Sequence, residues 1–262
     1  MKVTLASDVH FEFHKNEPNW LPKIAKNCDL IILAGDIEVG VAAIDSVLRI
    51  ADAHPQSQLI FVAGNHEFYR QNIEKQLEHY RQAFSKNTRV HFLENNHIEI
   101  NGYHILGCTL WTGFNILGDD KISKAMDESR LAIADFSLIR CGKNNREFAP
   151  QDAAARHEES CRWLISELEQ LESQKTIIVT HFPPCAKARN TFFKQSLLTP
   201  YFLADCQQII FDYQPLIWCY GHNHLSDDFV TGKTRVVSNQ LGYPNEPFDC
   251  NYNTQKIIDL LE

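Results

Sequence analysis

The chain has 262 residues, of which 44% are hydrophobic and 22% charged, and its net charge is −8. This composition is typical of a globular protein and excludes a disordered or low-complexity chain. The acidic balance argues against a nucleic-acid partner, because a polyanion is held by a broad basic surface. The length fits one α/β domain, so we expect a single domain over residues 1–262.

The first residues and the cysteines favour a cytoplasmic protein. Residues 1–5 lack the charged start and long apolar stretch of a signal peptide. Apolar runs elsewhere are about five residues long, whereas a membrane helix needs roughly 20, so no membrane span is predicted. The eight cysteines contain no C-x-x-C pair, and we expect most of them to be reduced and buried.

Five short apolar runs predict β-strands. They are continuous rather than alternating, which is typical of strands covered on both faces. Each run ends at a turn-forming or polar residue. The runs occupy residues 3–6, 30–33, 59–62, 176–179 and 216–219.

Apolar residues at helical spacing predict helices over residues 41–53, 71–85 and 152–173. The stretch 112–149 is less regular, with a helix expected only near 121–136. A long irregular stretch in a compact domain is often functional, so residues 112–149 are predicted to form either a cap or insertion over one face or a peripheral helix pair.

Two hairpins are predicted between the strands and helices. Asn101-Gly102 separates two apolar segments and is a strong two-residue turn signal. A second turn is expected near Thr231-Gly232-Lys233. Because crossovers are mixed with antiparallel hairpins, the sequence predicts two packed sheets rather than a single doubly wound one.

Metal-binding residue types follow all five predicted strands. Singly, each is most often a turn former or helix cap. Together they are expected to meet, because side chains at the carboxyl ends of neighbouring strands converge on one crevice. The five motifs are Asp8-x-His10, Gly35-Asp36, Gly64-Asn65-His66-Glu67, His181 and Gly221-His222-x-His224.

This series resembles the signature of the calcineurin-like metallophosphoesterases, D-x-H, G-D, G-N-H-[DE], H and G-H-x-H, over residues 8–224. The resemblance implies an α/β (α+β) fold, a four-layer αββα sandwich of two mixed sheets flanked by helices, with a dinuclear metal centre at the carboxyl ends of the strands. It implies that Asp36 bridges two metals. The implied ligands are Asp8, His10, Asp36 and His224 for one metal, and Asp36, Asn65, His181 and His222 for the other.

The residue types support this interpretation. Imidazole and carboxylate ligands with one amide oxygen suit Mn, Fe, Zn, Co or Ni. The absence of cysteine from the set favours two catalytic divalent ions over a closed structural zinc. Such a pair lowers the pKa of a bridging water, and the resulting hydroxide is the expected nucleophile. His66 lies outside the ligand set and is predicted to be the catalytic general acid.

The second motif differs from that of one branch of the family, the serine/threonine protein phosphatases. Serine/threonine protein phosphatases extend the second motif to G-D-x-x-D-R-G, but Val39 and Gly40 occupy the last D-R positions here. A protein phosphatase is therefore disfavoured. Glu38 or Glu67 is a candidate carboxylate partner for His66, and a solvated or capping role for each remains open.

Substrate contacts are less well defined by the sequence. Arg189 and Lys187 follow a rigid proline turn and are candidate substrate-binding residues, with a flexible surface loop as the alternative. The aromatic residues considered either for stacking on substrate or for the core are Trp111, Phe114, Phe192, Phe193 and Tyr243. No role is assigned to the histidines at positions 14, 54, 79, 91, 97, 104 and 157.

The function predicted from these features is dimetal-dependent hydrolysis of a small-molecule phosphate ester. A phosphodiester or phosphoanhydride is favoured over a monoester. Two alternatives remain. The first is a non-catalytic adaptor with the same fold, but the presence of Asp36 and His66 argues against it. The second is a metal-dependent nuclease, but the negative net charge argues against it. The oligomeric state is left open.

Overall fold

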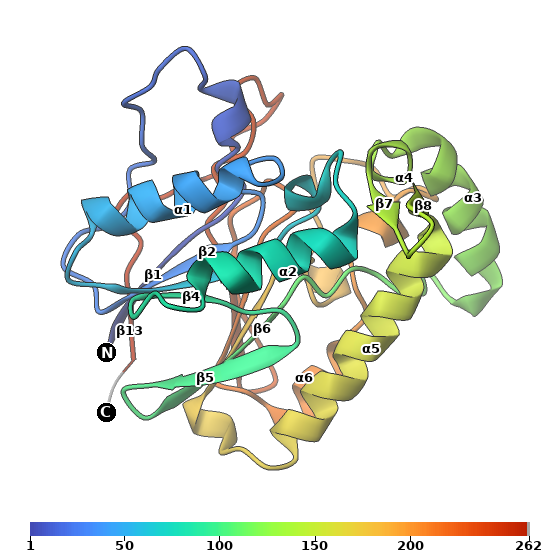
Figure 1. The fold of residues 1–262 in the computed structure, drawn as a ribbon. Coiled ribbons are helices and arrows are strands. Elements are labelled where there is room, and N and C mark those ends of the chain that lie inside the picture. Colours follow the sequence, from blue (N-terminus) through green and yellow to red (C-terminus); the bar gives the residue numbers. More distant parts are fainter. Residues whose placement is uncertain (261–262) are drawn as a thin grey trace.

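The computed structural model describes residues 1–260 and contains two large mixed β-sheets (Figure 1). In the first sheet β1 to β4 run parallel, and β13 pairs antiparallel with β1 at the edge. The strand order is β13 (Ile258–Asp259), β1 (Lys2–Ala6), β2 (Leu30–Ala34), β3 (Gln58–Val62) and β4 (Val90–Phe92).

The second sheet has four central parallel strands and an antiparallel hairpin strand at each edge. The five predicted strands are confirmed to within one residue at each end, and the edge strands β4 and β13 were not predicted. The order is β11 (Asp228–Thr231), β12 (Thr234–Ser238), β10 (Ile217–Tyr220), β9 (Thr176–Thr180), β6 (Tyr103–Cys108) and β5 (Asn96–Ile100).

Both predicted hairpins are confirmed. Asn101 and Gly102 have φ angles of 52° and 78°, as a two-residue turn of type I′ requires. Ile100 faces Tyr103 across that turn, and Thr231 faces Thr234 across the other.

The continuous apolar runs have a simple origin, because both faces of each strand are buried. Leu30 and Ile32 face the second sheet, together with Ile177 and Val179 of β9. The alternate side chains, such as that of Ile31, face the helices. The core therefore has an inter-sheet layer and outer layers beneath the helices.

Helices flank the two sheets, which confirms the predicted sandwich architecture (Figure 1). The long helices α1 (Ala42–Ala53) and α2 (Ile73–Phe84) lie on the first sheet, and α5 (Pro150–Leu168) and α6 (Gln207–Tyr213) on the second. Three of these were predicted, but α5 begins two residues earlier, with proline at its first turn, and ends before the expected residue 173. The chain turns there to enter β9.

The helix expected near 121–136 is confirmed in its first part, but it does not continue to residue 136. The structure has two helices, α3 (Ile122–Ala132) and α4 (Asp135–Leu138), separated by extended backbone at Ile133, with φ −99° and ψ 127°. The break carries Asp135 into a buried position, where its carboxylate accepts hydrogen bonds from Tyr69 and Tyr201. Tertiary hydrogen bonds thus override local helix propensity.

Short elements complete the described chain. A small two-stranded sheet pairs β7 (Arg140–Cys141) with β8 (Arg146–Glu147). The 3₁₀ helices are Phe11–Phe13, His66–Phe68, Asp119–Lys121, Ser173–Lys175, Ala186–Ala188 and Thr199–Phe202. All eight cysteines are free, and all but Cys161 are buried. Within residues 1–260, no helix combines the length and apolarity needed to cross a membrane.

Candidate metal centre

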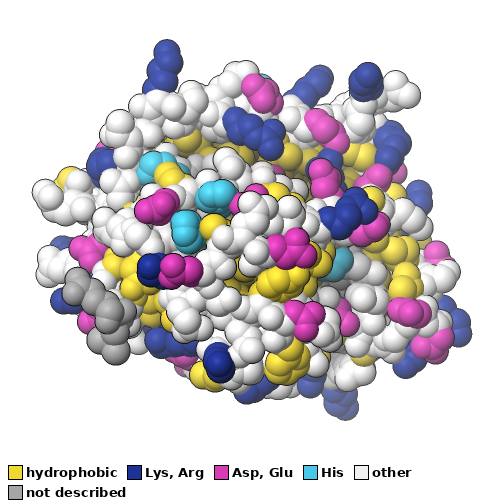
Figure 2. Space-filling view, turned by 90° about the horizontal axis from the view of Figure 1, so that it is seen from below, with side chains coloured by type: hydrophobic (Ala, Val, Ile, Leu, Met, Phe, Trp, Pro, Cys, Tyr) yellow, Lys and Arg dark blue, Asp and Glu magenta, His cyan; other side chains and the backbone are white. Residues whose placement is uncertain are grey.

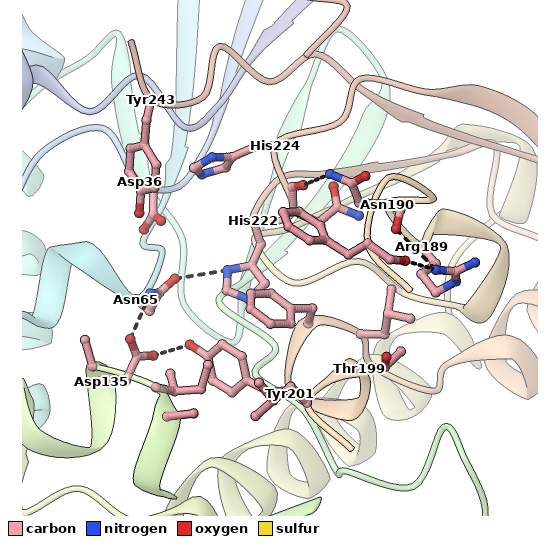
Figure 3. Close-up of a pocket in the computed structure, with 18 of the residues that line it drawn as sticks. Asp36, Asn65, Asp135, Arg189, Asn190, Thr199, Tyr201, His222, His224 and Tyr243 are labelled. Carbon is pink, nitrogen blue, oxygen red and sulfur yellow. Dashed lines mark hydrogen bonds between the residues drawn. The ribbon is translucent and has the colours of Figure 1, made fainter. Parts of the chain in front are cut away.

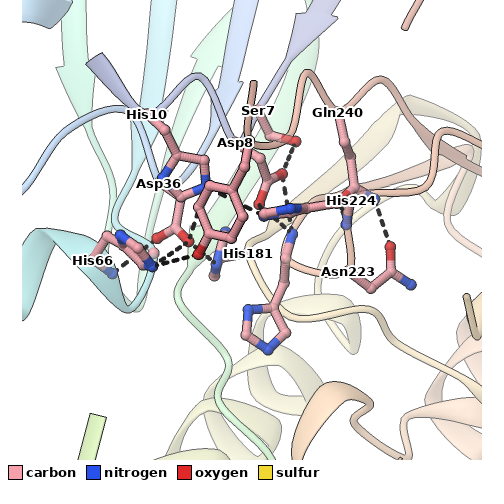
Figure 4. A network of polar contacts seen from close by, with 12 residues as sticks. Ser7, Asp8, His10, Asp36, His66, His181, Asn223, His224 and Gln240 are labelled. Carbon is pink, nitrogen blue, oxygen red and sulfur yellow. Dashed lines mark hydrogen bonds and ion pairs between the residues drawn. The ribbon is translucent and has the colours of Figure 1, made fainter. Parts of the chain in front are cut away.

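The predicted ligands and His66 lie together at the carboxyl ends of five parallel strands (Figure 3 and Figure 4). Each is at most 8% exposed, so their polar groups are removed from water and need partners. They follow β1, β2 and β3 of the first sheet and β9 and β10 of the second. The residues are Asp8, His10, Asp36, Asn65, His66, His181, His222 and His224.

The backbone at this edge is strained. Positive φ angles are found at five of the predicted ligands, although none is glycine. Such conformations persist where surrounding structure enforces them, and they cluster at functional sites. The angles are 53° at Asp8, 51° at His10, 53° at Asp36, 80° at His222 and 55° at His224.

Two motif glycines are required by close approach. A Cβ atom on Gly64 would collide with Oδ1 of Asp36, and one on Gly221 would lie 2.7 Å from Oδ2 of Asp8. The glycines therefore allow neighbouring strand ends to approach the two carboxylates. This explains why G-D, G-N-H and G-H, rather than the polar residues alone, form the pattern.

The first ligand group consists of Asp8, His10 and His224, whose candidate ligand atoms lie within 4.8 Å of one another. Nε2 of His224 lies 3.5 Å from Oδ1 of Asp8. Nδ1 of His10 contacts Glu12 at 3.0 Å, and Nδ1 of His224 contacts Glu246. When these Nδ1 atoms donate to the carboxylates, the Nε2 atoms present lone pairs to each other at 3.2 Å. A cation between them would satisfy both, so the donor set fits a metal.

The second group consists of Asp36, His181 and His222, joined by Asn65. Nδ1 of His181 donates to the carbonyl of Ala34 at 2.8 Å, which leaves Nε2 as an acceptor. Oδ1 of Asn65 lies 3.0 Å from that Nε2 and 3.1 Å from Nδ1 of His222. Several acceptor atoms therefore face one point, as around a cation.

Asp36 lies between the two groups. Its Oδ2 is 3.4 Å from Nε2 of His181 in the second group and 4.0 Å from Nε2 of His10 in the first. This is the position that a bridging carboxylate would occupy.

The electrostatics of this centre favour positive charge. Burial acts to raise the pKa of Asp36, but the His181 and His66 imidazoles outweigh it and hold that pKa well below its ordinary value. Burial likewise acts to lower the pKa of His181, but the Asp36 carboxylate raises it to about 9. In the absence of a metal, protons supply the positive charge that these carboxylates attract.

His66 is held at the side of the centre. Its Nδ1 lies 2.9 Å from Glu12, its Nε2 lies 3.1 Å from the hydroxyl of Tyr243, and the same Nε2 lies 3.9 Å from Asp36. Burial acts to lower the pKa of His66, but the Asp36 and Glu12 carboxylates raise it to about 9. The protonated form is therefore favoured, as a general acid requires.

The carboxylate beside His66 is Glu12 rather than either of the predicted candidates. Glu67 is fully buried, and it accepts backbone N–H groups of Gly64, Asp36 and Ile37 at 2.7 to 2.9 Å. Glu38 accepts a hydrogen bond from Ser46. Glu67 thus has the capping role that the sequence left open, holding two of the motif loops together.

A cavity of about 540 Å³ opens onto both ligand groups (Figure 3). Its inner end contains Asp36, Asn65, His66, His222 and His224. Three irregular segments enclose the rest: residues 132–135, 189–203 and 243–248. We call five apolar side chains on these segments the outer wall: Ile133, Phe193, Leu198, Phe202 and Phe248.

The two predicted substrate-binding cations differ in position. Arg189 lines the cavity, but its guanidinium donates to the carbonyls of Phe193 at 2.6 Å and Asn190 at 3.4 Å. Lys187 lies outside the cavity, where its ammonium donates to the Val230 carbonyl at 3.2 Å. The structure therefore brings only Arg189 to the cavity, and its side chain is already engaged.

The five aromatic candidates also lie in different parts of the structure. Trp111 and Phe114 are core residues, at most 1% exposed. Phe193 and Tyr243 line the cavity. Phe192 is exposed and packs against Phe193 and Phe248 at the rim.

Several residues of the site escaped the sequence analysis. Glu12 and Glu246 orient His10 and His224, and Asp135 accepts a hydrogen bond from Nδ2 of Asn65 at 3.1 Å. Gln240 accepts the backbone N–H of His224. Of these, only Glu12 carries a local signal, because it lies two residues after His10. The others come from segments without a motif.

Comparison with known proteins agrees with this geometry. The family model of the calcineurin-like phosphoesterases matches residues 1–226. The chain belongs to this family. It is accordingly a phosphoric ester hydrolase that depends on metal ions, and the adaptor alternative is set aside.

Individual relatives are distant. The chain is 26% identical over 221 residues to uncharacterized protein L509 of Acanthamoeba polyphaga mimivirus, covering 78% of this chain and 74% of that protein. Phosphopantetheinyl hydrolase (PptH) from Mycobacterium tuberculosis superposes with a TM-score of 0.71 at 18% identity, covering 93% of this chain and 90% of that one. TT1561 of Thermus thermophilus gives 0.53 at 14% identity, with 99% and 94% covered. The two structures share the fold with this phosphoesterase.

Proposed function

We propose that this phosphoesterase hydrolyses small-molecule phosphodiesters at the centre between the two ligand groups. The observation that carries the proposal is that one cavity opens onto both groups and onto His66. A cavity of about 540 Å³ lies in the range of small-molecule sites.

The residues that would hold one metal are Asp8, His10, Asp36 and His224, and those for the other are Asp36, Asn65, His181 and His222. When bound, two divalent cations supply an activated water nucleophile and neutralise charge that develops on the phosphoryl oxygens. The protein supplies orientation, since Glu12, Glu246 and the Ala34 carbonyl fix the rings of three histidines.

His66 is proposed to protonate the leaving oxygen. Glu12 contacts Nδ1 and keeps the imidazolium oriented, so the Nε2–H faces the cavity. The Tyr243 hydroxyl lies 3.1 Å from that Nε2 and accepts its hydrogen bond, which holds the imidazolium at the cavity, where the leaving oxygen of the substrate can share the same N–H.

Charge favours a diester over a monoester. Two divalent cations carry four positive charges, and four carboxylates lie within the centre or contact its histidines. Burial acts to raise the pKa of Glu12 and Glu246, but their histidine partners lower both, so they are ionised. Little net positive charge remains for a dianion, so a monoanionic diester costs less to bind. The four carboxylates are Asp8, Asp36, Glu12 and Glu246.

Phosphoanhydrides and nucleic acids receive less support. Each would place a second phosphate in the cavity. Of the two Lys and Arg side chains that line it among the described residues, Arg189 holds backbone carbonyls, which leaves Lys194 alone to pair with that phosphate. On the face in Figure 2, basic and acidic side chains are interspersed, and no basic patch stands out. A polyanion bound across that face would need such a patch.

We further propose that residues 112–149 serve as a cap within a single domain. The break between α3 and α4 contributes Ala132, Ile133, Ala134 and Asp135 to the cavity. The segment thereby shields one side of the centre from water.

The test is a comparison of bis(4-nitrophenyl) phosphate with 4-nitrophenyl phosphate, using protein supplied with Mn, Zn, Fe, Co or Ni. The diester should be hydrolysed with the higher kcat/KM, and the Asp36→Asn variant should lose this activity. Equal turnover of wild type and Asp36→Asn would rule out the proposed centre. A monoester preference would overturn the assignment of substrate.

A further inference from the structure

The outer wall bears on the chemistry of the group that is esterified to the substrate phosphate. We infer that it binds an uncharged, largely apolar arm of the phosphodiester, such as an alkyl or aryl group. The inference rests on the proposed function, because the arm enters the cavity from a phosphate held at the inner end.

The composition of the outer wall carries the first step. Its five apolar side chains come from three segments far apart in sequence, and they lie among polar lining residues of the same segments. Phe193 packs against Phe248 and Phe202 stacks on His222, yet Phe193 is still 53% exposed and Phe202 38%, so each retains apolar surface that a ligand can cover. Burying it against an apolar arm contributes about 0.8 kcal/mol for each methylene, or about fourfold in affinity.

The polar groups beside the outer wall carry the second step, because the protein already uses them. Asn190 donates to the Asn223 carbonyl at 2.8 Å and accepts from the backbone of Phe192. Asn223 donates to the Ala188 carbonyl at 2.6 Å and accepts from Gln240. Both amides are therefore committed.

The two hydroxyls in the same region already accept hydrogen bonds from the backbone. Thr199 accepts the backbone N–H of Ser196, and Ser196 accepts that of Leu198, which leaves one O–H donor on each. A nucleobase or sugar carries more donors and acceptors than these two O–H groups can pair, at a cost of about 1 to 3 kcal/mol for each unpaired group. Nucleotide and sugar arms are accordingly disfavoured.

Charge carries the third step. The cations in the cavity are Lys194, which has no partner among the described residues, and Arg189, which holds backbone carbonyls. Glu246 and Asp135 lie on the same lining. An anionic arm would gain little from Lys194, because the exposed ammonium is screened by water, and it would also meet Glu246 and Asp135. A neutral apolar arm requires no charged group to lose its hydration.

The experiment separates binding from turnover. Protein supplied with Mn²⁺ is titrated by calorimetry with methyl, butyl and hexyl esters of methylphosphonic acid, which are monoanions with poor leaving groups. We expect Kd to fall about fourfold with each added methylene until the cavity is filled. The 5′-thymidine ester should bind more weakly than the hexyl ester.

Substitutions in the outer wall test whether the chain-length effect on affinity arises there. Ile133→Asn should reduce the hexyl-to-methyl affinity ratio about tenfold, because the amide would meet the apolar arm. Leu198→Asn, on the opposite segment, should do the same if Ile133→Asn folds poorly. The matched control is Leu131→Asn, at an 88% exposed position of α3 outside the cavity, and it should leave the ratio unchanged.

The outcomes distinguish this inference from the proposed function. An affinity independent of chain length, tighter binding of the thymidine ester, or an equal loss in Leu131→Asn would overturn the apolar-arm inference, even where diester hydrolysis persists. A clear chain-length effect without hydrolysis of any diester would support the outer wall and contradict the proposed function.

Discussion

The two ends of the cavity are built differently. The inner end is made of charged and imidazole side chains at the carboxyl ends of parallel strands, each at most 8% exposed. The outer end carries the five apolar side chains of the outer wall, which come from irregular segments and lie among amides, hydroxyls and two cations, and Phe193 there is 53% exposed. Strands thus hold the groups that need accurate placement, and the proposed contacts of the loops with substrate need only shape and polarity.

This difference predicts which kinetic constant a substitution at each end of the cavity changes. Changes at the inner end should lower kcat, because they remove interactions made with the reacting phosphate. Changes at the outer end should alter substrate affinity and preference with little effect on kcat.

The largest effect is expected at Asp36. Asp36→Asn removes the charge that both ligand groups share and should lower kcat about 10³-fold. It should also reduce the metal content of the purified protein, measured by plasma mass spectrometry. The exposed Asp119→Asn variant is the matched control and should change neither quantity. Full metal content with turnover within threefold of wild type would contradict the bridging role.

His66→Ala should have the next largest effect, and its size should depend on the leaving group. With diphenyl phosphate, whose phenol leaving group requires a proton, kcat should fall about 10²-fold. With bis(4-nitrophenyl) phosphate the loss should be much smaller, because nitrophenolate leaves unaided. An equal loss for both substrates, measured against the exposed His79→Ala control, would argue for a structural role.

Tyr243→Phe tests the contact between the inner end and the 243–248 segment. Loss of its hydroxyl from the 3.1 Å contact with Nε2 of His66 should lower kcat about tenfold and leave KM nearly unchanged. Tyr213→Phe is the control, because the Tyr213 hydroxyl on α6 lies outside the cavity and contacts Glu169 at 3.5 Å. A rise in KM without a change in kcat would place Tyr243 in substrate binding instead.

The smallest effects are expected at the two cations that follow β9. Arg189→Ala removes hydrogen bonds to the 190–193 backbone and should raise KM about fivefold, with kcat within twofold. Lys187→Ala should leave both constants within twofold, because its ammonium lies outside the cavity. Steady-state kinetics with the same diester checks both, and a larger loss in Lys187→Ala would reverse their assignment.

Sequence patterns predicted the elements whose signal is local. The Asn101-Gly102 turn and the five buried strands could be located because each is specified within a few adjacent residues. The end of the helix expected near 121–136 was misjudged, since its break at Ile133 depends on the contact of Asp135 with Tyr69 and Tyr201. The carboxylate beside His66, Glu12, was missed for the same reason, because this contact joins residues that are far apart in sequence.

By itself, the sequence determined the five motifs and their order, and the resemblance of this series to a family signature implied the set of candidate metal ligands. Parallel pairing brings the first three motifs to one edge of the first sheet and the last two to one edge of the second, and the packing of the two sheets joins these edges. Only the tertiary structure decided which groups surround the ligands. Glu12 and Tyr243 reach His66 across 54 and 177 residues of chain, and the outer wall assembles from three separate segments. These contacts depend on how loops pack, and no periodicity in the sequence encodes that packing.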